Sequence, residues 1–480
     1  MSTQSFNLNE TTINTIQQAM DSGELTALEL TKMYLEQIAK HNSSGPKINA
    51  IIEINPDALH IAEGLDIERA KSGKRGPLHG IPILIKDNID SGDKMHTSAG
   101  SVALANHYAS EDAFVTKKLR VAGAIILGKT NLTEWANFMT EGMTNGYSSR
   151  GGQVLNPYGP GKFDVGGSSA GSGAGVAANL AAAAIGTETD GSILSPSSSN
   201  SLVGIKPTVG LVSRTGIIPI AHSQDTAGPM TRTVEDAAIL LGALTGEDDV
   251  DSATAMNHDR ITDYTPFLIK SGLTNTRIGI PRNYLSKLDA SELQLVNQAL
   301  EDMKKLGATI VDPIDLPDNL PDSSVLFHEF KNGVNAYLGK LPAHSPVHSL
   351  LEVINFNQSH ADKALNYGQT RLTRSETKSG TLTEEEYITD RLTDLRISQE
   401  KIQEVINEHR LDTIFFPNND GSSIAARAGY PSITVPAGYT NAGKPVGATF
   451  TGQAFSEGKL IEIAYAYEQA TNHRKSPILE

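Results

Sequence analysis

The sequence of 480 residues contains no cysteine and a single tryptophan. Without cysteine the chain has no disulfide, no thiol nucleophile and no cysteine-ligated zinc. Basic residues are in the minority, because 40 lysines and arginines stand against 55 aspartates and glutamates, giving a formal net charge of −15. A nucleic-acid-binding surface needs clustered positive charge to neutralise phosphates, so this balance argues against a nucleic-acid partner.

Long apolar runs are also missing. The alanine-rich stretch at residues 176–185 is shorter than the roughly 20 residues that cross a bilayer. Residues 1–12 lack the basic-then-apolar order of a signal peptide. We therefore expect a cytoplasmic protein without membrane association, and the sequence predicts no particular oligomeric state. Apolar residues make up 39% of the chain, which is enough for a large core.

Apolar segments that are typical of strands alternate with segments of helical period along the chain. This alternation predicts an α/β fold with a mixed sheet. Residues 320–410 are expected to be mostly helical and carry no recognisable chemical motif. Strands are predicted at 81–85, 124–127, 202–205, 277–281, 413–416 and 432–435, and helices at 11–42, 111–122, 174–184, 233–244, 291–306 and 460–470.

The segment Gly123–Thr130 fits the P-loop pattern GxxxxGK(S/T) in form. A phosphate cradle needs flexible backbone between its glycines, so that several N–H groups can converge on one anion. Here the four intervening residues are Ala-Ile-Ile-Leu, which are typical of a strand. We interpret the segment as a core strand followed by a turn, and not as a nucleotide site.

The segment Gly167–Gly171 matches GxSxG, the nucleophile elbow of α/β-hydrolases, with Ser169 at the central position. That elbow requires an apolar strand directly before it and a histidine later in the chain. Residues 160–166 have the composition of a loop, and no histidine stands in a distinctive context. A serine esterase of this class stays open as an alternative.

A larger constellation combines two glycine–serine turns with a lysine. The turns at residues 166–169 and 191–192 flank a stretch of small residues, and Lys86 ends the strand predicted at 81–85. One such turn alone is most often a tight turn with a solvent-facing serine. Two turns and a strand-end lysine favour a catalytic site, because a serine nucleophile needs a base. Burial lowers the pKa of a lysine and makes its neutral form available as that base.

These segments resemble the amidase signature family, and they occur in the family's order. Where the family usually has glycine this chain has Asp190, within the form Thr-Glu-Thr-Asp-Gly-Ser. That form is similar to the branch that contains peptide amidases, which remove ammonia from C-terminal peptide amides. The resembling stretches are Gly76–Asn88, Gly128–Leu132, Gly166–Ser172, Gly186–Pro196, Gly204–Arg214, Asp225–Pro229 and Gly429–Gly438.

The resemblance implies one domain over residues 1–480, with a mixed central β-sheet covered by α-helices on both sides. Residues 76–238 would form its core and residues 1–75 its N-terminal helices. Residues 239–480 would complete the sheet and add helical insertions.

The resemblance also implies a mechanism without metal or cofactor. Ser192 is the nucleophile that forms an acyl-enzyme, and Lys86 is the base. Ser168, which follows a cis peptide bond in the family, relays the proton between them. The backbone N–H groups that would form the oxyanion hole belong to Thr189, Asp190, Gly191 and Ser192.

The remaining motif residues are expected to have structural or substrate-binding roles. Trp135 is expected in the core, and the loop at residues 143–152 is expected to form a wall of the substrate pocket. Candidate braces between loops are Asn131, Glu134, Arg214 and Asp225. Candidate substrate contacts are Met143, Ser148, Ser149 and Asp190.

The substrate stays open between C-terminal peptide amides and other small carboxamides. One alternative in the same family is the glutamine-using A-type subunit of a tRNA-dependent amidotransferase, to which the negative charge gives no support. Another is a binding protein that has the fold without catalysis. The presence of all three triad residues argues against the latter.

Overall fold

The computed structural model describes residues 6–257 and 261–479. In these residues eleven strands form one sheet, in the order β1-β3-β2-β6-β8-β7-β12-β13-β11-β9-β10. A separate short hairpin pairs β4 with β5. The strands are β1 (Ile51–Ile54), β2 (Pro82–Lys86), β3 (Ile125–Thr130), β4 (Tyr147–Ser148), β5 (Gly152–Gln153), β6 (Ala183–Glu188), β7 (Val203–Lys206), β8 (Thr226–Thr231), β9 (Arg277–Gly279), β10 (Thr309–Val311), β11 (Thr413–Pro417), β12 (Ser432–Tyr439) and β13 (Pro445–Thr451).

The sheet is mixed, as predicted. β2 runs parallel to β3 and β6 on its two sides, whereas β8 runs antiparallel to β6 and β7. Because the carboxyl ends of parallel strands meet at one edge of a sheet, β2 and β6 deliver their last residues to the same place. Lys86 ends β2 and Glu188 ends β6.

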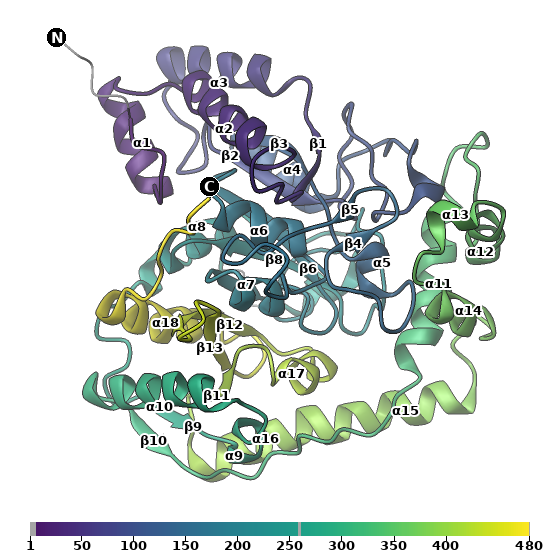
Figure 1. Cartoon of the computed structure of the whole chain (residues 1–480). Helices are drawn as coiled ribbons and strands as arrows, with labels where there is room; N and C mark the ends of the chain where they lie inside the picture. The colour runs from purple at the N-terminus through teal and green to yellow at the C-terminus, as the bar shows by residue number, and fades with distance from the viewer. Residues whose placement is uncertain (1–5, 258–260, 480) are drawn as a thin grey trace.

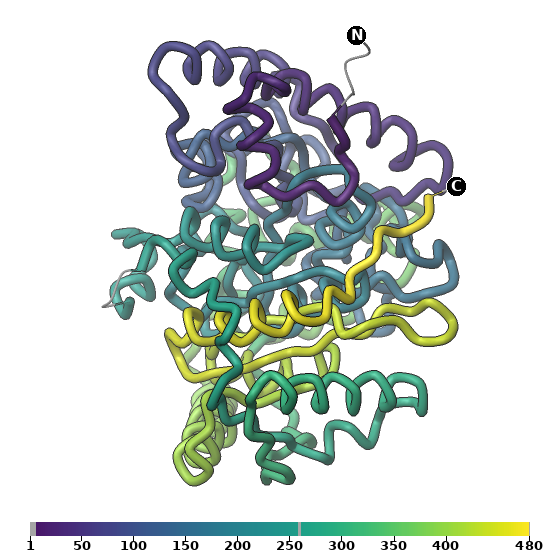
Figure 2. Tube along the Cα trace, turned by 90° about the vertical axis from the view of Figure 1, so that its left-hand side faces the viewer, coloured from purple at the N-terminus to yellow at the C-terminus, as the bar shows by residue number. Residues whose placement is uncertain are grey.

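Helices flank this sheet on both sides, which confirms the α/β prediction (Figure 1). α6 contacts α7, and α8 contacts both α4 and α18. Figures 1 and 2 show the N-terminal helices at one end of the molecule and α10 at the other. These helices are α1 (Ile13–Ser22), α2 (Ala27–His41), α3 (Ala58–Ser72), α4 (Phe114–Val121), α6 (Ala170–Ala177), α7 (Leu194–Ser199), α8 (Val234–Leu244), α9 (Arg282–Leu285), α10 (Ala290–Lys305), α17 (Ser422–Ala428) and α18 (Glu457–Thr471).

A helical insertion covers residues 325–409, and its part up to residue 395 lies to the right in Figure 1. Its first helices pack on α5 (Glu134–Asn137) through a second cluster of apolar side chains, which we call the insertion core. Trp135 belongs to this cluster, with 2% exposure and an edge-on contact to Phe330, so its predicted core position is confirmed. The insertion consists of α11 (Val325–Leu338), α12 (Leu350–Ser359), α13 (Ala361–Ala364), α14 (Thr370–Glu376), α15 (Glu385–Leu395), a π-helical turn (Arg396–Glu400) and α16 (Lys401–His409).

The boundaries show where local sequence decides structure. Thr26 and Glu29 form the capping box that starts α2, as predicted, although residues 11–42 make two helices instead of one. The helix predicted at 174–184 is wrong, because α6 ends at Ala177 and β6 begins at Ala183. A run of small apolar residues carries no 3.6-residue period, and β6 is buried along its whole length.

The segment with the P-loop pattern is a strand, as interpreted. Gly128 lies inside β3, where a Cβ atom would come 2.5 Å from the Glu53 carbonyl oxygen of β1. This glycine therefore allows two strands to approach, and Lys129 buries its amine against Ile89 and Thr97. Among the described residues no helix has the length and apolarity needed to cross a membrane.

Candidate active site

Lys86 places its amine inside the protein at the end of β2, where its side chain is fully buried. Its Nζ lies 2.8 Å from Ser168 Oγ, 2.9 Å from Thr187 Oγ1 and 3.2 Å from the Thr187 carbonyl oxygen. Burial lowers the pKa of Lys86 to about 7, although the carboxylates of Glu188 and Asp225 oppose this shift. The amine can therefore gain or lose a proton near neutral pH.

Ser168 reaches Lys86 from the turn that precedes α6. The Gly167–Ser168 peptide bond is cis. Ser169 fixes this turn to β6, because its Oγ donates to the Thr187 carbonyl oxygen at 3.0 Å and accepts from the Thr187 N–H at 3.2 Å. The hydroxyl of Ser169 is thus used inside the protein, and a loop precedes it where an elbow needs a strand. The α/β-hydrolase alternative gains no support.

Ser192 lies in the turn between β6 and α7, and the residue is 7% exposed. The carboxylate of Glu188 accepts from the N–H groups of Ile193 at 2.7 Å and Leu194 at 3.0 Å. Burial raises the pKa of Glu188, and Lys206 together with these N–H groups opposes that shift. The Ser192 carbonyl oxygen accepts from the Ser169 N–H at 3.2 Å, so the two serine-bearing turns are joined through their backbones.

The turn also presents free N–H groups. Gly191 has φ +79°, which bends the backbone sharply before Ser192. In the part of the chain that the structure describes, the N–H groups of Thr189, Asp190 and Ser192 donate to no protein acceptor. The N–H of Gly191 instead faces the Glu188 carboxylate. Three of the four predicted oxyanion donors are therefore available to a ligand, and the role of the hole stays a prediction.

Each of the four residues predicted to brace loops bonds to another part of the protein, and two of them, Arg214 and Asp225, also line a cavity. Their roles stay predictions. Asp225 accepts from Thr189 Oγ1 at 2.5 Å and from the N–H groups of Ile220 and Ala221 at 2.8 and 2.9 Å. Arg214 pairs with Asp251, Asn131 with Ser148, and Glu134 with Ser149.

The predicted substrate contacts are mostly engaged within the protein. Ser148 Oγ donates to Asn131 at 2.7 Å and Ser149 Oγ donates to Glu134 at 2.9 Å, while Met143 packs in the insertion core. Asp190 accepts from the hydroxyls of Ser422 and Ser423, at 2.9 and 2.7 Å, and so ties the turn to α17. Substrate contact by these four residues stays a prediction.

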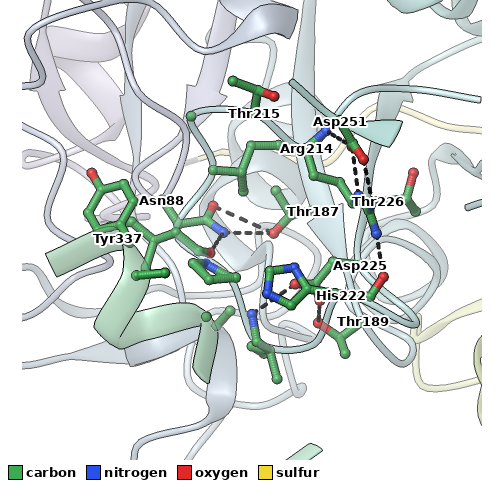
Figure 3. A pocket seen from close by; sticks show the side chains of 18 of the residues that line it. Asn88, Thr187, Thr189, Arg214, Thr215, His222, Asp225, Thr226, Asp251 and Tyr337 are labelled. Carbon is green, nitrogen blue, oxygen red and sulfur yellow. Dashed lines mark hydrogen bonds and ion pairs between the residues drawn. The ribbon is translucent and has the colours of Figure 1, made fainter. Parts of the chain in front are cut away.

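A cavity of about 230 Å³ opens beside Thr187, the residue whose hydroxyl contacts the Lys86 amine (Figure 3). Asn88, Thr187 and Asp225 line it from the sheet edge, and Gly333, Ala336 and Tyr337 line it from α11. The spacing of the latter three places them on one face of the helix. Asn88 and Thr187 lie within the resembling motifs but were not singled out from sequence. Tyr337 lies in the insertion, where no sequence pattern marks it.

Comparison with known proteins decides the family, because the amidase family model matches residues 29–423. The chain belongs to the amidase family. The "Probable amidase" of Arabidopsis thaliana is 43% identical over 486 residues, covering 98% of this chain and 92% of that protein. The crystal structure of native peptide amidase from Stenotrophomonas maltophilia matches this amidase with a TM-score of 0.92 at 44% identity, covering 98% of this chain and 99% of the other.

In sequence, the A-type amidotransferase subunits match a smaller part of the amidase than these two relatives do. The A-type glutamyl-tRNA(Gln) amidotransferase subunit from Methylobacillus flagellatus is 43% identical over 301 residues, which are 62% of this chain and 58% of that protein. The family match thus confirms an enzyme that acts on amide bonds. Peptide amidase is more similar over the full length than a solved A-type subunit from Thermotoga maritima, which covers 99% of both chains with a TM-score of 0.73 at 26% identity.

Proposed function

We propose that this amidase hydrolyses a carboxamide through an acyl-enzyme on Ser192, with Lys86 as base and Ser168 as proton relay. The observation that carries the proposal is the 2.8 Å contact between Lys86 Nζ and Ser168 Oγ, made by a fully buried amine. A buried lysine that meets a serine hydroxyl can take its proton once the amine is neutral.

The proposed reaction has two stages, acylation of Ser192 and hydrolysis of the acyl-enzyme, and both use the relay from Ser192 through Ser168 to Lys86. Lys86 takes the proton of Ser168, and Ser168 takes that of Ser192 as Ser192 Oγ bonds to the amide carbon. The N–H groups at residues 189–192 bind the resulting oxyanion. The proton then returns to the leaving nitrogen, the C–N bond breaks and ammonia departs. Water then gives a proton to the same relay as its oxygen bonds to the acyl carbon. The bond to Ser192 Oγ breaks, Ser192 regains its proton through the relay, and the acid departs.

The proposed substrates are C-terminal peptide amides or other small carboxamides. The likeness to peptide amidase supports this choice, because it spans nearly the whole of both chains. The likeness to the solved A-type amidotransferase subunit also spans both chains, but at 26% identity and a TM-score of 0.73, against 44% and 0.92 for peptide amidase.

A panel of amides tests the proposal. Ammonia release is measured from a peptide amide, an aliphatic carboxamide and glutamine, with the natural protein and with Lys86→Ala. We expect turnover of the first two substrates and none by the variant. Turnover of glutamine alone would favour the amidotransferase alternative. Folded protein that cleaves none of these amides and does not react with a fluorophosphonate at Ser192 would favour the binding-protein alternative.

The pH dependence follows from the Lys86 amine. Only its neutral form accepts a proton, and burial lowers its pKa to about 7. We therefore expect kcat/KM to rise tenfold per pH unit below about pH 7 and to level off above it. Measurement of kcat/KM between pH 5 and 9 checks this expectation. An acidic limb that instead ended near pH 10 would contradict the neutral-amine mechanism.

A further inference from the structure

A second cavity, of about 410 Å³, lies beside the two glycine–serine turns. Its walls include Asn145, from the loop before the first turn, and Asn419, which follows β11. Each turn meets one of these asparagines at the glycine that precedes its serine. A Cβ atom at Gly167 would lie 2.7 Å from Asn145 Oδ1, and a Cβ atom at Gly191 would lie 3.4 Å from Asn419 Nδ2. The cavity therefore adjoins the backbone that carries both proposed catalytic serines.

The polar groups next to these glycines are free to bind a ligand. Asn145 Nδ2 donates to the Asp164 carboxylate at 3.1 Å, which leaves Asn145 Oδ1 as an acceptor. Among the described residues, no protein group bonds to the side chain of Asn419. Ser195 Oγ accepts from the Gly167 N–H at 3.4 Å and keeps its own hydrogen to donate. Free donors and a free acceptor side by side suit a peptide backbone, which offers one N–H and one C=O per residue.

The two cavities differ in size and in what their walls offer. The second cavity falls within the range of about 300–1,000 Å³ that is usual for ligand sites, and the first is smaller. Most polar side chains of the first cavity already bond within the protein, as Asn88 does to Thr187, Thr189 to Asp225 and Arg214 to Asp251. The charges that line the second cavity nearly balance, and they belong to Lys287, Lys444, Asp164, Glu292 and Asp420. A neutral peptide chain fits such a wall better than a strongly charged ligand does.

We propose that the second cavity is the subsite for the peptide segment that precedes a C-terminal amide, so that peptide amides are preferred over single-residue carboxamides. The scissile amide lies at Ser192, and the residues before it extend along the cavity wall. Asn419 donates to a backbone carbonyl oxygen of this segment, and Asn145 accepts from one of its backbone N–H groups. This inference rests on the proposed role of Ser192 as nucleophile.

Substrates of two lengths test the subsite. N-acetylalanine amide is too short to extend along the cavity, whereas N-acetyltrialanine amide reaches it, and neither substrate is charged. The ratio of their kcat/KM values, long over short, is measured for the natural protein, Asn419→Ala and Asn145→Ala. We expect a ratio of about ten or more in the natural protein. Each variant should lower the ratio about fivefold, the usual effect of losing one hydrogen bond. Asn419→Ala removes a side chain that bonds to no described protein group, so the fold should be retained.

Asn441→Ala is the matched control and should keep the ratio, because Asn441 is exposed between β12 and β13 and lines neither cavity. A ratio near one in the natural protein, or an unchanged ratio in both test variants, would overturn the inference. A ratio that falls only in Ala336→Leu would overturn it as well, because the peptide would then lie in the first cavity. Fluorophosphonate labelling separates the two levels. Failure of the natural protein to label at Ser192 refutes the proposed function and the inference together, whereas labelling without a length preference refutes the inference alone.

Discussion

Lys86→Arg is expected to lower kcat for amide hydrolysis by about 10²–10⁴-fold, the usual contribution of a general base. A guanidinium stays protonated at every accessible pH and cannot take the proton of Ser168. Lysine can do so here because burial brings the pKa of its amine to about 7. The rate of ammonia release checks the prediction, and the loss should persist up to pH 9.

Two controls separate this loss from misfolding. Lys86→Met has a similar length and no base, so it should be folded by circular dichroism and equally inactive. Lys206→Arg changes another fully buried lysine at the end of a strand, whose amine donates to the carbonyl oxygens of Pro207 and Tyr430. It keeps charge and donors, so activity should stay within a few-fold. Retained activity in Lys86→Arg would contradict the base assignment.

The part of the fold that follows from the sequence is the part with strong local signals. β2 is predictable because Ile83, Leu84 and Ile85 are consecutive and branched or long, and all are fully buried. β8 is not, because Gly228 and Pro229 at its centre are typical of a turn. The structure explains that glycine through packing, since a Cβ atom would lie 2.1 Å from the Ile205 carbonyl oxygen of β7. The need for glycine at position 228 is set by the neighbouring strand β7, so the local sequence of β8 does not reveal it.

The candidate site likewise contains residues that the sequence predicts and residues that only the folded structure reveals. The resemblance identified Lys86 and Ser168, and the structure brings them into contact. The resemblance could not identify the hydrogen-bond partners of Lys86 that depend on strand register. Thr187 meets the amine because β6 lies parallel beside β2, a pairing between residues about one hundred positions apart. Tyr337 reaches the cavity only through the packing of the insertion, which no local pattern records.

Ser192→Ala is expected to have the largest effect, a fall in kcat of about 10⁴-fold or more, as for loss of other serine nucleophiles. Neither serine of the other glycine–serine turn can substitute for Ser192. Ser168 already contacts the Lys86 amine, and Ser169 is held by the backbone of Thr187. The turn itself should survive, because the Ser192 bond to Ser169 uses the carbonyl oxygen and the Glu188 bonds use later N–H groups. Ammonia release and thermal unfolding measure the two effects separately.

Chemical labelling tests directly whether Ser192 Oγ is the nucleophile. A fluorophosphonate should modify Ser192, mapped by mass spectrometry of the digested protein, and Ser192→Ala should remove the label. Ser169→Ala is the matched control and should leave the label on Ser192. A label that remains on Ser169 in the Ser192→Ala variant would assign the nucleophile to the other glycine–serine turn. The relay from Lys86 would then have to be redrawn, because Ser169 donates to a carbonyl oxygen and not to the amine.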